Sequence, residues 1–178
     1  MRTKQFPLKL RRRIIHPLCL HTTDIHGGYL GGILLVLISV FVRCLSGSPY
    51  RYYPALRAIC KLPPFALITF IHLLLMFAMG FACGLILCEH GYHPRGDQYR
   101  AGMIFVILVT LYMAIHPLLF RIGLPWIAIT VLGAVLALSL LCTRLFASIR
   151  RLCGMIVLVF SCWVIYLIVI LFTCLLRI

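Results

Sequence analysis

Residues 52–64 read YYPALRAICKLPP and lie between two long apolar runs, where a membrane protein needs only a polar turn. Connections between packed helices are usually short, so a long one that contains an aromatic pair and a Pro-Pro step indicates a functional segment. On a helix, the segment has an apolar face that consists of Tyr53, Leu56, Ile59 and Cys60. Another face is basic and contains Arg57 and Lys61. This pattern predicts a short amphipathic helix across the mouth of a helix bundle or in the headgroup plane. Pro63 and Pro64 would then end it and begin the next span, where a missing N–H costs little.

The rest of the chain consists mainly of apolar runs. Of its 178 residues 63% are apolar, whereas soluble domains have roughly 45–50%. About 20 apolar residues cross the hydrocarbon core of a bilayer. This criterion predicts five spans, at residues 28–45, 63–88, 101–120, 123–142 and 153–176. We therefore expect an all-α membrane protein, a five-transmembrane-helix bundle (residues 28–178) with a long, partly helical first loop, preceded by a basic tail at residues 1–27.

The charge of the chain is strongly positive, with 17 Lys and Arg residues against 3 acids. In a soluble protein this would suggest a nucleic-acid partner, but here the basic residues flank apolar runs, so we interpret them as headgroup anchors and expect no nucleic acid. The tail has no apolar core of the signal-peptide type, so we expect it to stay uncleaved against anionic lipid. With five spans, 11 Lys and Arg residues lie on the side of the tail and 6 on the other. The positive-inside rule then predicts a cytoplasmic N-terminus.

Two groups of ionisable residues are candidates for a site. Cys88, His90 and His93 share one short loop, but their spacing matches no common metal site, so we predict a solvated loop and no metal. His72 and His116 lie within predicted spans, and an intramembrane ionisable group is a functional hypothesis by default. The alternative is a neutral imidazole that is hydrogen-bonded to a neighbouring helix.

Small residues form two further patterns. Three glycine pairs at a spacing of four residues would let helices approach closely: Gly27/Gly31, Gly28/Gly32 and Gly80/Gly84. We favour packing within one chain, and a homodimer seam is the alternative. The cysteines lie in or beside apolar runs, and we interpret them as small buried packing residues, for example Cys83, Cys142, Cys162 and Cys174.

Catalytic residue patterns are missing from the sequence. No acid lies within a predicted span, which excludes paired carboxylates, an HExxH motif and a proton relay there. There is also no Ser/His/Asp set and no phosphate-binding loop. We therefore predict no catalytic residues and no enzymatic activity.

The segment at residues 52–82, YYPALRAICKLPPFALITFIHLLLMFAMGFA, resembles the translocator protein family (TspO/MBR, tryptophan-rich sensory proteins). The family pattern there is Trp-Tyr-x-x-Leu, Pro-Pro, a Trp in the second helix and Met-Gly-x-Ala. Seven residues match it without a gap: Tyr53, Leu56, Pro63, Pro64, Met79, Gly80 and Ala82. His72 occupies the place of the helix-two tryptophan. AIHPLLF at residues 114–120 and LVFSCWVIYL at residues 158–167 resemble the third-helix and fifth-helix segments, and only Trp126 and Trp163 remain of the tryptophans.

The resemblance implies a five-helix bundle whose pocket, capped by the first long connection, binds a hydrophobic aromatic ligand. That ligand would be a porphyrin or other tetrapyrrole, haem-like or not, or a sterol-like molecule, bound for transport or sensing. Its implied binding residues are Tyr53, Pro63, Pro64, His72, Tyr112 and Trp163. The lost tryptophans leave an alternative open, a structural or assembly membrane protein with no small-molecule ligand. A channel would need a polar stripe along several spans, and the spans contain only isolated polar residues.

Overall fold

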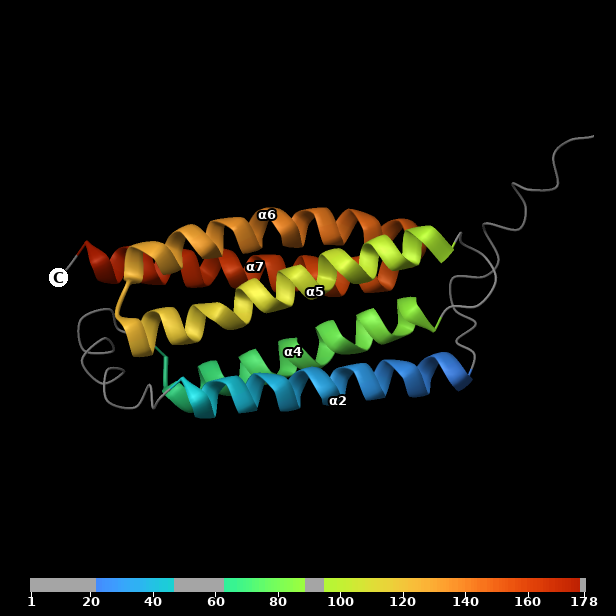
Figure 1. The fold of residues 1–178 in the computed structure, drawn as a ribbon, viewed down its shortest axis with the longest axis horizontal. Coiled ribbons are helices and arrows are strands. Elements are labelled where there is room, and N and C mark those ends of the chain that lie inside the picture. The colour runs from blue at the N-terminus through green and yellow to red at the C-terminus, as the bar shows by residue number, and fades with distance from the viewer. Residues whose placement is uncertain (1–21, 47–62, 89–94, 177–178) are drawn as a thin grey trace, which may run out of the picture.

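The computed structural model describes residues 22–46, 63–88 and 95–176, and in this part of the chain five long α-helices run side by side (Figure 1). Their bounds are α2 Thr22–Leu45, α4 Phe65–Leu87, α5 Arg95–Pro117, α6 Pro125–Ile149 and α7 Arg151–Leu175, with a π-helical turn η2 at Leu118–Ile122. All five are long and apolar enough to cross a membrane. The prediction of an all-α bundle with five transmembrane helices is confirmed.

Three helices, α2, α5 and α6, extend beyond the apolar runs that predicted them. α2 begins at Thr22, within the predicted tail, and α6 continues to Ile149, past the predicted end at residue 142. Hydropathy marks only the part of a helix inside hydrocarbon, whereas the backbone hydrogen bonds continue into the interface until the chain geometry changes. At Arg150 that change is an extended backbone. The predicted amphipathic helix of the first loop lies outside the described residues, as do Tyr53, His90 and His93.

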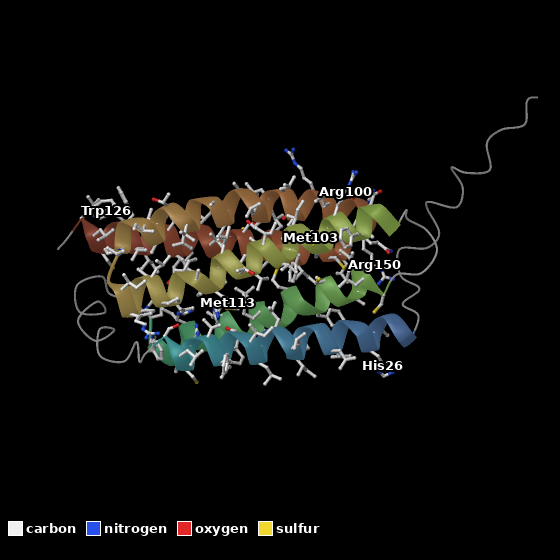
Figure 2. All side chains as sticks on the ribbon, viewed as in Figure 1. His26, Arg100, Met103, Met113, Trp126 and Arg150 are labelled. Carbon is white, nitrogen blue, oxygen red and sulfur yellow. The ribbon has the colours of Figure 1, made fainter. Side chains whose placement is uncertain are left out.

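The helices form a ring in the order α2, α4, α7, α6 and α5, with the most extensive packing in the pairs α2–α4 and α6–α7. We call the end at which α2 begins the proximal end and the end at which α4 begins the distal end. His26, Arg100 and Arg150 lie at the proximal end and Trp126 at the distal end (Figure 2). The ring brings α4 beside α7, although α5 and α6 separate them in the sequence.

Glycines join α2 to α4. A Cβ placed on Gly80 would overlap the carbonyl oxygen of Gly31, and one on Gly84 would overlap the carbonyl oxygen of Gly27. The two backbones therefore touch directly, which is how small residues join helices in a membrane. The prediction that the glycine pairs pack within one chain is confirmed.

The hairpin between α5 and α6 follows from three residues. Pro117 lacks the N–H that would continue the α-helical ladder, and a π-helical turn follows it. Gly123 then adopts a left-handed conformation, φ 73°, which a residue with a side chain rarely adopts. Pro125 begins α6, where its missing N–H needs no partner.

The cysteines divide into two groups. Cys83 and Cys142 are buried in the core, as predicted. The predicted burial is also confirmed for Cys174, although this residue is disulfide-bonded, and it was wrong for Cys162, which is exposed. α7 is apolar all round, so its sequence does not show which face points outward, and the interpretation of Cys162 as buried had no basis in periodicity.

Candidate ligand-binding site

A chain of hydrogen bonds crosses four helices in the distal half of the bundle. His72 of α4 is 2% exposed, and its Nε2 lies 2.9 Å from Ser39 Oγ of α2. Its Nδ1 lies 2.9 Å from the hydroxyl of Tyr112 of α5. That hydroxyl also accepts a hydrogen bond of 3.2 Å from Trp163 Nε1 of α7. His72 is thus the buried imidazole bonded to neighbouring helices, which was one of the two interpretations.

The bonding pattern assigns the tautomer of His72. Trp163 Nε1 can only donate, so the Tyr112 oxygen accepts there and its own proton needs an acceptor. Nδ1 of His72 is that acceptor when the imidazole carries its proton on Nε2. Nε2–H then donates to Ser39 Oγ. The opposite tautomer would leave the Tyr112 proton without an acceptor among these groups, so we assign the Nε2–H form.

Aromatic rings fill the space around this chain. The Tyr112 ring stacks on His72 at 5.5 Å between centroids and meets the edge of Phe160 at 5.0 Å. His116 meets His72 edge to face at 5.6 Å and stacks on Phe120. The bundle interior at this level is therefore packed with side chains, and both nitrogens of His72 are engaged.

A cavity in the distal half lies on the flank of the bundle, between α4 and α7. Its volume is about 360 Å³, at the lower end of the roughly 300–1,000 Å³ range of small-molecule pockets. Its lining is mainly apolar and aromatic and comprises Pro63, Leu67, Ile68, Ile71, Leu75, Val159, Cys162, Trp163 and Tyr166. Leu67 is 47% exposed and Val159 58% exposed, so the cavity is a groove that opens sideways toward the bilayer. We call it the α4–α7 groove.

The predicted binding residues do not gather in one place. Pro63 and Trp163 line the groove. Pro64 precedes the first turn of α4 and does not line it. His72 and Tyr112 lie behind it in the hydrogen-bonded chain, which Trp163 joins to the groove. Within the described ranges, no three His, Cys, Asp or Glu side chains are placed to hold a metal ion.

Sequence reasoning missed Ser39 and treated Arg43 only as a headgroup anchor. The two residues are four apart on α2 and therefore share a helix face, a signal that was available. Arg43 is partly buried and lies one helical turn after Ser39, the hydrogen-bond partner of His72. Its Nε atom is buried and has no hydrogen-bond partner in the described part of the chain.

These features define the class of the protein. It is an integral multi-pass membrane protein whose five spanning helices surround a hydrogen-bonded interior, and an aromatic groove lies on one flank of the bundle. The family model of the TspO/MBR family matches residues 32–177. The chain belongs to that family, and the resemblance stated from the sequence is confirmed. No curated protein and no solved structure matched the chain in the corresponding searches.

Proposed function

We propose that this TspO/MBR protein binds a hydrophobic aromatic ligand, a porphyrin-like tetrapyrrole or a sterol-like molecule, in the α4–α7 groove for transport or sensing. The observation that carries the proposal is the position of Trp163. Its ring lines the groove, while its N–H is bonded to Tyr112, so the indole is held in place before a ligand arrives. Flat apolar ligands bind well to fixed aromatic faces with a few polar groups nearby. Tyr166, 5.3 Å from Trp163 between ring centroids, supplies a second aromatic ring.

A second candidate function is a structural or assembly protein without a ligand. The packed interior favours it, because Tyr112, Phe160 and His72 occupy the space between the helices. Under this alternative the groove holds only lipid chains. The two functions differ in whether the groove selects a ligand.

Titration of the detergent-purified chain with protoporphyrin IX tests the choice, with binding followed by the absorbance of the porphyrin. We expect saturable binding that Val159→Trp abolishes, because the larger side chain fills the groove. Val169→Trp is the matched control, since Val169 is also an exposed valine of α7, 57% against 58%, but does not line the groove. Trp163→Phe should weaken binding several-fold, and Trp126→Phe should leave it unchanged.

A result in which both valine variants bind like the unchanged chain would place the ligand elsewhere. Absence of saturable binding of protoporphyrin IX and of a sterol-like probe would favour the structural alternative. The predictions of no catalytic activity and of a homodimer alternative stay predictions.

We also propose that the N-terminus faces the cytoplasm. The excess of basic residues on the side of the tail supports this orientation, 11 Lys and Arg against 6. The disulfide of Cys174 supports it independently, because Cys174 lies in the last turn of α7 at the distal end. Disulfides persist in oxidising compartments rather than in the cytoplasm. The distal end, with the groove, would then face away from the cytoplasm.

A further inference from the structure

Arg43 is a cation without a counter-ion among the residues that the structure describes. It lies in the last turn of α2, inside a membrane-spanning helix, and its side chain is partly buried. Its Nε is buried without a hydrogen-bond partner among the described residues. A charged group in a transmembrane helix is costly unless it reaches water or an opposite charge. A buried guanidinium nitrogen without a partner therefore needs an explanation.

A second donor without a partner lies near Arg43. His116 of α5 contacts the rings of His72 and Phe120, but neither of its nitrogens is hydrogen-bonded to a residue that the structure describes. Arg43 follows Ser39 by one turn of α2, and Ser39 is bonded to the same His72 whose ring His116 contacts. His72 and Tyr112 already use their polar atoms in the hydrogen-bonded chain. They offer Arg43 no negative charge.

No acidic side chain lies at this end among the residues that the structure describes. Of the three acids in the sequence, Asp24 and Asp97 lie in the first turns of α2 and α5, at the proximal end, and Glu89 lies outside the described residues, two positions after the end of α4. α4 has 23 residues, which at about 1.5 Å per residue separates the two ends by roughly 35 Å. Six basic residues, in contrast, belong to the distal side by sequence. Among the described residues, therefore, no side chain supplies an anion for Arg43, and a bound molecule can.

We propose that Arg43 and His116 form an anion site at the distal end of the bundle, which binds the oxyanion of an amphipathic molecule. The chemistry is that of a carboxylate or phosphate, because a guanidinium presents a planar set of donors to either group and an imidazole N–H adds another. Two sources can supply this group, the acid groups of the ligand proposed for the groove or the headgroup of an anionic lipid. The first source rests on the proposed function, and the second does not.

Two measurements on the detergent-purified full chain separate the sources. The first compares the dissociation constants of protoporphyrin IX, which has two carboxylates, and its dimethyl ester, which has none. The second compares the unfolding temperature with dioleoylphosphatidylglycerol and with dioleoylphosphatidylcholine. If the ligand supplies the anion, the dissociation constant of the unchanged chain is lower for the free acid than for the ester by roughly tenfold or more. Arg43→Gln then removes this difference without weakening binding of the ester. If lipid supplies it, phosphatidylglycerol raises the unfolding temperature of the unchanged chain but not of Arg43→Gln.

Arg121→Gln is the matched control, because Arg121 is exposed in η2 at the same end and its removal changes the net charge equally. It should behave like the unchanged chain in both measurements. Arg43→Lys keeps the charge and should retain part of whichever preference is observed, which separates lost anion binding from misfolding.

The inference is overturned if Arg43→Gln and Arg121→Gln behave alike in both measurements. If neither porphyrin binds, the tetrapyrrole form of the proposed function fails and the lipid measurement alone decides on the anion site. If the ester binds and the free-acid preference survives Arg43→Gln, the groove function stands while Arg43 is removed as its anion receptor.

Discussion

Replacing Gly80 by Ala tests the direct contact between the backbones of α2 and α4. The new Cβ would overlap the carbonyl oxygen of Gly31 and lie 2.9 Å from the Cα of Gly32. Carbon atoms in good contact are about 3.5–4.0 Å apart. The two helices must therefore separate by roughly 0.5–1 Å, which forfeits about a quarter to a half of the dispersion energy of each contact across the seam.

The expected cost is that of overpacking, about 1–3 kcal/mol. Alanine also raises helix propensity by about 1 kcal/mol relative to glycine, so the effect of Gly80→Ala alone is ambiguous. Gly133→Ala resolves the ambiguity, because Gly133 lies within α6 and a Cβ there meets nothing within 4 Å. The same propensity gain applies to both variants and cancels in their difference. Gly80→Ala should therefore be less stable than Gly133→Ala by about 1–3 kcal/mol.

Unfolding of the purified protein in mixed micelles of increasing SDS content, followed by far-UV circular dichroism, measures this difference. We expect the midpoint of Gly80→Ala to fall below that of Gly133→Ala, and the midpoint of Gly133→Ala to stay at or above that of the unchanged chain. Equal midpoints for the two alanine variants would refute the reasoning, since they would mean that α2 and α4 have room for a methyl group at this point.

Three further predictions concern the polar contacts and the topology. Tyr112→Phe removes the hydroxyl that joins His72 to Trp163, so the unfolding free energy should fall by about 1 kcal/mol. In a Trp126→Phe background the fluorescence emission of Trp163 should also shift. An unchanged emission spectrum and an unchanged unfolding midpoint would show that the hydroxyl is not shared. Ser161 Oγ lies 2.9 Å from Ser139 Oγ across α6 and α7, so a double-mutant cycle of the two alanine variants should give a coupling of about 0.6 kcal/mol, and zero coupling would contradict the bond. Epitope tags at the two termini should be accessible on opposite faces of the membrane, with the N-terminal tag cytoplasmic, and detection of both tags in unpermeabilised cells would contradict five spans.

The number and approximate location of the helices could be predicted because hydropathy is a local property of the chain. His72 illustrates the limit of that reasoning. Its position in an apolar span identified it as a candidate, but its partners Ser39 and Tyr112 come from two other helices. Identifying them requires the order of the helices in the ring, which depends on contacts between distant segments.

The α4–α7 groove also shows that the sequence does not reveal which residues of different helices face each other. Trp163 was predicted as an aromatic wall from the family resemblance, and it does line a cavity. The α4 residues opposite it, such as Leu67 and Ile71, belong to a helix that is apolar all round, so no periodicity marks the face that they share. Arg43 was counted as a headgroup anchor because the sequence does not show that its helix neighbour Ser39 is bonded to His72, which His116 of α5 contacts.

The position of the groove follows from how helices associate in lipid. The hydrophobic effect gives no net attraction between helices there, so close packing depends on small residues and polar contacts. α2 and α4 have the glycines, and α6 and α7 have Gly154 against Ala147, where a Cβ on the glycine would lie 2.8 Å from the alanine Cα.

α4 and α7 meet through large side chains instead, among them Leu67, Ile71, Val159 and Trp163. The bond from Trp163 to Tyr112 ties α7 to α5 rather than to α4. The two pairs with the most extensive packing, α2–α4 and α6–α7, thus meet at a seam between α4 and α7, α5 completes the ring, and the groove lies along this seam. A ligand that enters there displaces lipid chains and breaks none of the bonds that hold the pairs together.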